Sequence, residues 1–136
     1  MKILFVSLKH YDANPNLGVS YEYSNFYLNL KKHYEIVDHF PIDLIVKEHK
    51  GQNLDDALAN VYSNYDFIFF FMYKNDFSIQ LLQKIKEDPN IKSISWFSDD
   101  DWRYEIYSQK YIDCFDLIIT TYKNAFQKYK RDGQKN

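Results

Sequence analysis

The sequence contains few of the residues that mark several familiar protein classes. Its 136 residues include one cysteine, Cys114, so no disulfide can form within the chain. Glycine occurs only three times, and neither G-x-G-x-x-G nor G-x-x-x-x-G-K-[ST] is present, which argues against a dinucleotide or P-loop phosphate site. The formal net charge is −2, without the basic excess that is usual for nucleic-acid-binding proteins.

Long hydrophobic runs are also absent. The apolar run near the start, Ile3–Leu8, is interrupted by Ser7 and meets Lys9 and His10 at once. It is shorter than a signal-peptide core and far shorter than a membrane span. With the lone cysteine, this predicts a cytoplasmic protein that has no integral membrane segment.

Aromatic residues, in contrast, are abundant. The chain has 13 Tyr and 11 Phe, and 46% of its residues are hydrophobic. Its length suits one domain with a single well-filled core, which we expect to span residues 1–136. Because a tyrosine hydroxyl must reach water or a partner, many rings are expected at the boundary of that core.

Apolar runs recur along the chain, and they predict strands. Runs that are apolar on both faces suit a parallel sheet covered on both sides. The predicted strands are Ile3–Leu8, Phe67–Met72, Ile94–Phe97 and Leu117–Thr121, with a weaker one, Tyr34–Phe40, nearer an edge.

Segments with helical periodicity lie between these runs, while residues 41–52 are expected to form a loop. Asn53 is a predicted N-cap and Thr121 another, and Pro89 ends a helix. The alternation of strands and helices predicts a doubly wound, mostly parallel, Rossmann-like α/β fold. The predicted helices are Tyr23–Tyr34, Leu54–Tyr65, Phe77–Ile85, Trp102–Tyr111 and Tyr122–Tyr129.

Three consecutive carboxylates, Asp99, Asp100 and Asp101, follow one predicted strand in the segment WFSDDDWRYE. In open α/β sheets, ligands bind beyond the carboxyl ends of the strands. Asp100 or Asp101 is expected to cap the next helix, and a carboxylate here could also orient or deprotonate a hydroxyl group. Consecutive side chains point in different directions, so the triplet does not predict a metal site.

Other candidate residues lie at the same predicted edge of the sheet. His10 ends the first strand, where its ring could transfer a proton or simply lie at the surface. Tyr11 is in the following loop, and Tyr21 and Glu22 open the first helix. Arg103 could bind a phosphate or carboxylate, or pair with a neighbouring aspartate.

Four segments together resemble the N-terminal half of CgeB-like glycosyltransferases, relatives of the family-4 sugar transferases with the GT-B architecture. They are KILFVSLKHYD, SYEYSNFYLNLK, WFSDDDWR and FDLIITTYKNAFQKYK. The resemblance implies two Rossmann-like domains that face a cleft, of which the N-terminal one contacts the acceptor and the C-terminal one holds the nucleotide-sugar. It therefore implies that this chain is the acceptor-side domain, inactive alone, with no metal and no cofactor.

These observations give one preferred function and one rival. The preferred function is acceptor binding within a glycosyltransferase; the rival is a non-catalytic α/β module that binds a ligand or a protein. The candidate catalytic residues are Asp100 and His10, and the candidate substrate-binding residues are Tyr11, Tyr21, Glu22, Asp99, Asp101 and Arg103.

The C-terminal segment carries five cations between Lys123 and Lys135, with Phe126 and Tyr129 among them. A solvated helix face explains them better than RNA or an anionic membrane. The helix stop at Arg131-Asp132-Gly133 would normally precede another strand. We therefore expect an uncovered sheet end and self-association, most simply as a two-fold homodimer.

Overall fold

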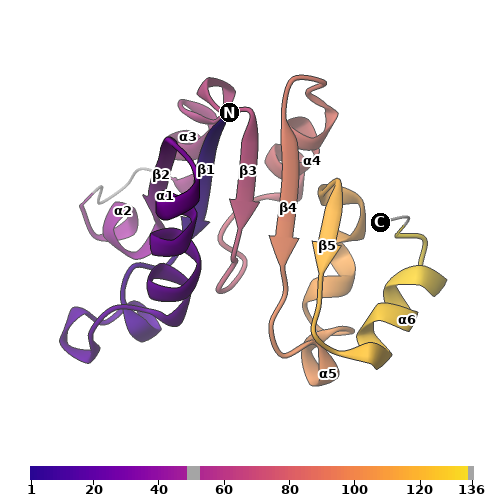
Figure 1. Ribbon diagram of the computed structural model, residues 1–136. Helices are drawn as coiled ribbons and strands as arrows, with labels where there is room; N and C mark the ends of the chain where they lie inside the picture. The colour runs from indigo at the N-terminus through magenta and orange to yellow at the C-terminus, as the bar shows by residue number, and fades with distance from the viewer. Residues whose placement is uncertain (49–52, 135–136) are drawn as a thin grey trace.

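In the computed structural model, which describes residues 1–48 and 53–134, five parallel strands form one sheet (Figure 1). The strand order is β2-β1-β3-β4-β5. This confirms the predicted doubly wound, Rossmann-like α/β fold and the edge position of the second strand. The strands are β1 (Lys2–Ser7), β2 (Ile36–Pro41), β3 (Phe67–Phe70), β4 (Lys92–Trp96) and β5 (Leu117–Ile119).

Helices connect successive strands, as the sequence predicts. A π-helical segment, Tyr23–Tyr27, leads into α1, and Asn53 caps α3 by accepting a hydrogen bond from the Asp55 backbone N–H at 3.2 Å. Short 3₁₀ turns cover Tyr11–Ala13, Pro15–Leu17, Tyr62–Asn64 and Ser108–Cys114. The α-helices are α1 (Leu28–His33), α2 (Ile42–Glu48), α3 (Leu54–Ala59), α4 (Ile79–Glu87), α5 (Asp100–Arg103) and α6 (Lys123–Arg131).

Aromatic side chains cover the sheet on both faces. On one face, the buried ring of Phe5 in β1 stacks on Phe26 of the π-helical segment, with ring centroids 6.4 Å apart. On the opposite face, Phe70 of β3 packs against Phe77 and Phe115, at 5.9 and 5.3 Å. Side chains of a strand alternate between the faces, so each strand of this kind must be apolar on both sides.

Tyrosines lie deeper in the core than the sequence analysis predicts. Tyr104 and Tyr111 are almost completely buried, and each hydroxyl has a partner. The Tyr104 hydroxyl donates to Asp132 at 2.8 Å, and the Tyr111 hydroxyl donates to Asn75 at 3.2 Å. A hydrogen-bond acceptor near the core boundary allows the ring itself to be buried. Cys114 is buried.

The predicted loop over residues 41–52 is wrong for Ile42–Glu48, where α2 forms, while residues 49–52 lie outside the described residues. The α2 segment contains the β-branched residues Ile42, Ile45 and Val46, which have only moderate helix propensity, although Leu44 is a good helix former. Ile42 is buried in the main core, so tertiary packing supports the helix. The helix also places Asp43 in its first turn, close to the end of β1.

Two further local predictions are wrong. The predicted helix Trp102–Tyr111 is broken into α5 and a separate 3₁₀ turn that begins at Ser108. The Tyr107 hydroxyl donates to the Lys74 carbonyl at 2.5 Å, which holds this segment against the β3–α4 loop. Thr121 does not cap α6; the Tyr122 backbone N–H donates instead to Thr120 Oγ1 at 3.3 Å.

The sheet is less well covered toward β5. Phe69, Ile94 and Leu117 are neighbours in register on the face that carries Phe26, and all three are partly exposed. The predicted homodimer remains a prediction. Within residues 1–48 and 53–134, no helix combines the length and apolarity that crossing a membrane requires.

Candidate functional site

A cleft lies at the carboxyl ends of β1 and β3, where the connections from neighbouring strands run in opposite directions. This switch point is where open α/β sheets bind ligands. Two adjoining pockets, of about 170 and 300 Å³, share Leu8, Glu22 and Tyr73, and we call them together the β1/β3 cleft. The other lining residues are Phe71, Met72, Ser98, Asp99 and Arg103 in the first pocket and Tyr11, Asp12 and Ser20 in the second.

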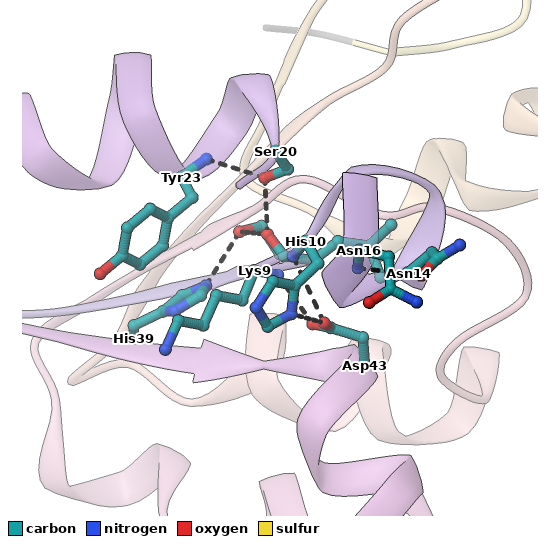
Figure 2. Close-up of polar contacts among 10 residues, drawn as sticks. Lys9, His10, Asn14, Asn16, Ser20, Tyr23, His39 and Asp43 are labelled. Atoms are coloured by element: carbon teal, nitrogen blue, oxygen red, sulfur yellow. Dashed lines mark hydrogen bonds and ion pairs between the residues drawn. The ribbon is translucent and has the colours of Figure 1, made fainter. Parts of the chain in front are cut away.

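Ser20 fixes the helix start that carries Glu22. The buried Ser20 hydroxyl donates to the Leu8 carbonyl at 2.8 Å and accepts from the Tyr23 backbone N–H at 3.0 Å (Figure 2). It therefore joins the end of β1 to the first helical turn. Among the residues that the structure describes, none makes a hydrogen bond or ion pair with the Glu22 carboxylate, so this group is available to a ligand in the cleft.

Asp99 lines the cleft in a left-handed backbone conformation, with φ 61°. Aspartate tolerates this region better than most residues, and such outliers gather at binding sites. Its carbonyl accepts from the backbone N–H groups of Trp102 and Arg103, at 3.2 and 3.0 Å, and so starts α5. The predicted side-chain cap by Asp100 or Asp101 is therefore wrong, since the main chain of Asp99 provides the start.

Arg103 lines the same pocket as Glu22. Its guanidinium stacks 4.1 Å from the centre of the Tyr107 ring, and Nη2 donates to the Tyr73 carbonyl at 3.3 Å. Within the described residues it forms no ion pair with an aspartate, so that predicted pairing is wrong. A guanidinium has five N–H donors, and the single hydrogen bond leaves others for a ligand.

Tyr73 and Asp12 meet above the second pocket. The Tyr73 hydroxyl donates to the Asp12 carboxylate, and this hydrogen bond raises the pKa of Tyr73. Asp76 holds the Tyr73 backbone in place, because its carboxylate accepts from the N–H groups of Tyr73 and Lys74 at 2.8 and 2.9 Å. Burial raises the pKa of Asp76 above the usual aspartate value.

Asp100, a candidate catalytic residue, lies in the core and does not line the cleft. Its side chain is fully buried, and it accepts from the Ser108 hydroxyl at 2.5 Å and the Tyr129 hydroxyl at 2.9 Å. Burial raises its pKa, while these hydrogen bonds and one with Thr120 act in the opposite direction. This position gives Asp100 a structural role.

His10, the other candidate catalytic residue, forms a close pair with Asp43 (Figure 2). Its Nδ1 lies 2.7 Å from Asp43 Oδ2, and the same carboxylate accepts from the backbone N–H of Lys9 at 2.7 Å. Burial opposes ionisation of Asp43, but the hydrogen bonds from Lys9 and His10 outweigh it and lower its pKa. An ionised carboxylate only accepts, so Nδ1 carries the proton. His10 is not among the residues lining the cleft.

Two candidate substrate-binding residues, Tyr21 and Asp101, do not line the cleft. The Tyr21 side chain is 63% exposed, with its ring against Phe26, and Asp101 is also exposed. The structure thus brings four of the eight candidates together: Tyr11, Glu22, Asp99 and Arg103. Sequence reasoning missed Asp12, Ser20, Tyr73 and Ser98, although each follows the end of a predicted strand or lies in the loop after one.

Other features of the described surface are poorer candidates for a ligand site. A pocket of about 190 Å³ lies between β5 and α6, but its lining is largely apolar, with Ile118, Ile119 and Phe126. It is also remote from the switch point. In the part of the chain that the structure describes, no three His, Cys, Asp or Glu side chains are grouped so that they could hold a metal ion.

Comparison of the chain with protein-family models, with curated proteins and with solved structures found no match. The resemblance to CgeB-like glycosyltransferases therefore stays a prediction. The β1/β3 cleft itself is the strongest guide to function.

Proposed function

We propose that this chain binds a small, hydroxyl-rich ligand, most simply a sugar, in the β1/β3 cleft. One observation carries the proposal: Glu22, Asp99 and Arg103 line a single cleft at the switch point of the sheet. Binding sites combine a mostly preformed hollow with a few convergent polar groups, and this cleft has both.

The chemistry of these groups suits sugar hydroxyls. The carboxylates of Glu22 and Asp99 can accept hydrogen bonds from them, and Arg103 can donate to their oxygen atoms. Phe71 and Met72 supply apolar surface in the same pocket for the carbon side of a sugar ring. The mixture of two acceptors, one donor and an apolar wall therefore matches a ligand with several hydroxyl groups.

Within the predicted glycosyltransferase, the bound sugar would be the acceptor. A second domain would hold the nucleotide-sugar, and a carboxylate beside the acceptor hydroxyl would serve as general base. Glu22 is the best placed residue for that step, because it lines both pockets and no described residue pairs with its carboxylate.

A non-catalytic ligand-binding module is the second candidate. It is favoured by the positions of Asp100 and His10, neither of which lines the cleft. The two candidates share the binding site and differ in whether a bound sugar is ever modified.

Calorimetric titration with a panel of neutral, amino and acidic monosaccharides tests the proposal. We expect at least one to bind, and Glu22→Gln to weaken it about tenfold, the effect of one hydrogen bond to a charged group. Glu35→Gln is the matched control, since Glu35 is exposed in the connection between α1 and β2. The absence of binding across the panel, or equal affinities for both variants, would contradict sugar binding at this cleft.

A further inference from the structure

We propose that residues 11–19 form a strap over the β1/β3 cleft, and that the hydrogen bond from Tyr73 to Asp12 is its latch. The strap is the loop after β1, and each of its nine residues is exposed. Tyr11 and Asp12 of the strap and Tyr73, which follows β3, all line the larger pocket. The latch therefore joins two separate segments that line the cleft. The proposal rests on the proposed function only in taking this cleft as the binding site.

The base of the strap is firmly held. His10 and Val19 form an antiparallel bridge, and the Ser20 backbone N–H donates to the Lys9 carbonyl at 2.8 Å. Asp43 fixes the same point from α2 by accepting from the Lys9 backbone N–H, as Figure 2 shows. The two ends of the strap thus stay together whatever the strap does.

The body of the strap is stiff. It contains two consecutive 3₁₀ turns, Tyr11–Ala13 and Pro15–Leu17. The Asn14 side chain accepts from the Asn16 backbone N–H at 3.0 Å, a local hydrogen bond that supports the second turn. Fixed ends and internal turns limit the conformations that the strap can adopt.

The latch is the strap's tie to the segment that follows β3. Among the described residues, the Tyr73 hydroxyl makes the one hydrogen bond that links residues 11–19 to a part of the chain beyond residue 20. Tyr73 is a firm anchor, since Asp76 holds its backbone. On the strap, Asp12 and Ala13 have φ of 50° and 57°, a conformation unfavourable for alanine. Release of the latch would let these residues relax and open the cleft.

Reaction of a thiol placed inside the cleft measures opening without any ligand. Glu22→Cys puts a thiol where both pockets meet, and the rate of its alkylation by iodoacetamide reports access. The native Cys114 serves as an internal slow reference, because it is buried and its burial raises the pKa to about 11. We expect Tyr73→Phe, added to Glu22→Cys, to speed alkylation about tenfold.

Tyr65→Phe is the matched control. The Tyr65 hydroxyl donates to Asp38 at 2.9 Å, so this change removes a tyrosine–aspartate hydrogen bond of the same kind away from the cleft. Its alkylation rate should equal that of Glu22→Cys alone. Equal rates for Tyr73→Phe and Tyr65→Phe would overturn the latch.

A second variant removes the latch by a change at Asp12, on the strap. Asp12→Gly removes the acceptor and suits the positive φ, so it should also speed alkylation about tenfold. The double change Asp12→Gly with Tyr73→Phe should be no faster than either alone, because both remove the same hydrogen bond. Fully multiplicative effects would contradict the latch. No sugar is present in these measurements, so a failed sugar titration would leave their outcome unaffected.

Discussion

The Tyr129 hydroxyl donates a hydrogen bond to Asp100 Oδ2 at 2.9 Å, which ties α6 to the first residue of α5. The Ser108 hydroxyl donates to the other carboxylate oxygen at 2.5 Å. Hydrogen bonds offset the cost of burying a carboxylate. Those to Asp100 come from three separate segments, which contain Ser108, Thr120 and Tyr129. Asp100 thus holds the C-terminal part of the domain together.

Replacing Asp100 tests that role. Asp100→Ala should lower the free energy of unfolding by about 3 kcal/mol, because it leaves buried hydroxyl groups without their acceptor. Asp113→Ala is the matched control: Asp113 is exposed in the same connection, and its loss should change stability by less than about 0.5 kcal/mol. Urea unfolding measures both, and similar values would show that the buried network contributes little.

The backbone of Asp99 gives a second prediction. Asp99→Asn should leave stability nearly unchanged, because asparagine accepts the left-handed conformation as readily as aspartate. Asp99→Ala should cost about 1–2 kcal/mol, measured by thermal unfolding. If alanine is as stable as asparagine at this position, the left-handed conformation is not the constraint that the structure indicates.

His39 predicts a dependence of stability on pH. Burial lowers its pKa from 6.5 to about 4, and its Nε2 lies 3.0 Å from the Ser7 hydroxyl. Between these values the unfolded chain binds a proton that the folded protein does not, so stability falls as the pH falls from about 6.5 to 4. The loss should reach about 2–3 kcal/mol.

Urea unfolding at pH 7.0 and 4.5 checks this, with His39→Gln as the comparison. Glutamine can still hydrogen-bond to Ser7 but does not titrate, so the variant should lose less stability than the parent on acidification. An identical loss in both proteins would assign the pH dependence to other groups.

The strands were predictable because their signal is local. Phe67–Phe70 and Leu117–Ile119 are apolar on both faces, and a doubly covered parallel sheet requires that pattern. The α2 segment gave no such signal, since its helix depends on the burial of Ile42 against distant residues. Tertiary packing overrides weak propensity at such places.

The site was predictable only in its position. The rule for carboxyl ends of parallel strands selected Tyr11, Glu22, Asp99 and Arg103, which line the cleft. It could not separate Asp99, which lines the cleft, from Asp100, which is buried, because the partners of Asp100 are distant in sequence. Tyr73 also follows a predicted strand, but its contact with Asp12 spans 61 positions, so the sequence did not indicate that the two side chains meet.

The isolated chain should not bind nucleotide-sugars tightly, since its sequence has no glycine-rich phosphate loop. Calorimetry with UDP-, GDP- and ADP-sugars should give no micromolar isotherm. A clear micromolar isotherm would contradict the prediction that this chain is the acceptor-side domain of a glycosyltransferase.

The location of a bound sugar tests the central claim most directly. In ¹H–¹⁵N NMR spectra titrated with the tightest-binding monosaccharide of the panel, we expect shifts centred on the amides of Glu22, Tyr73, Asp99 and Arg103, which line the β1/β3 cleft. Shifts centred instead on Ile119 and Phe126, in the pocket between β5 and α6, or no shifts with any sugar, would contradict it.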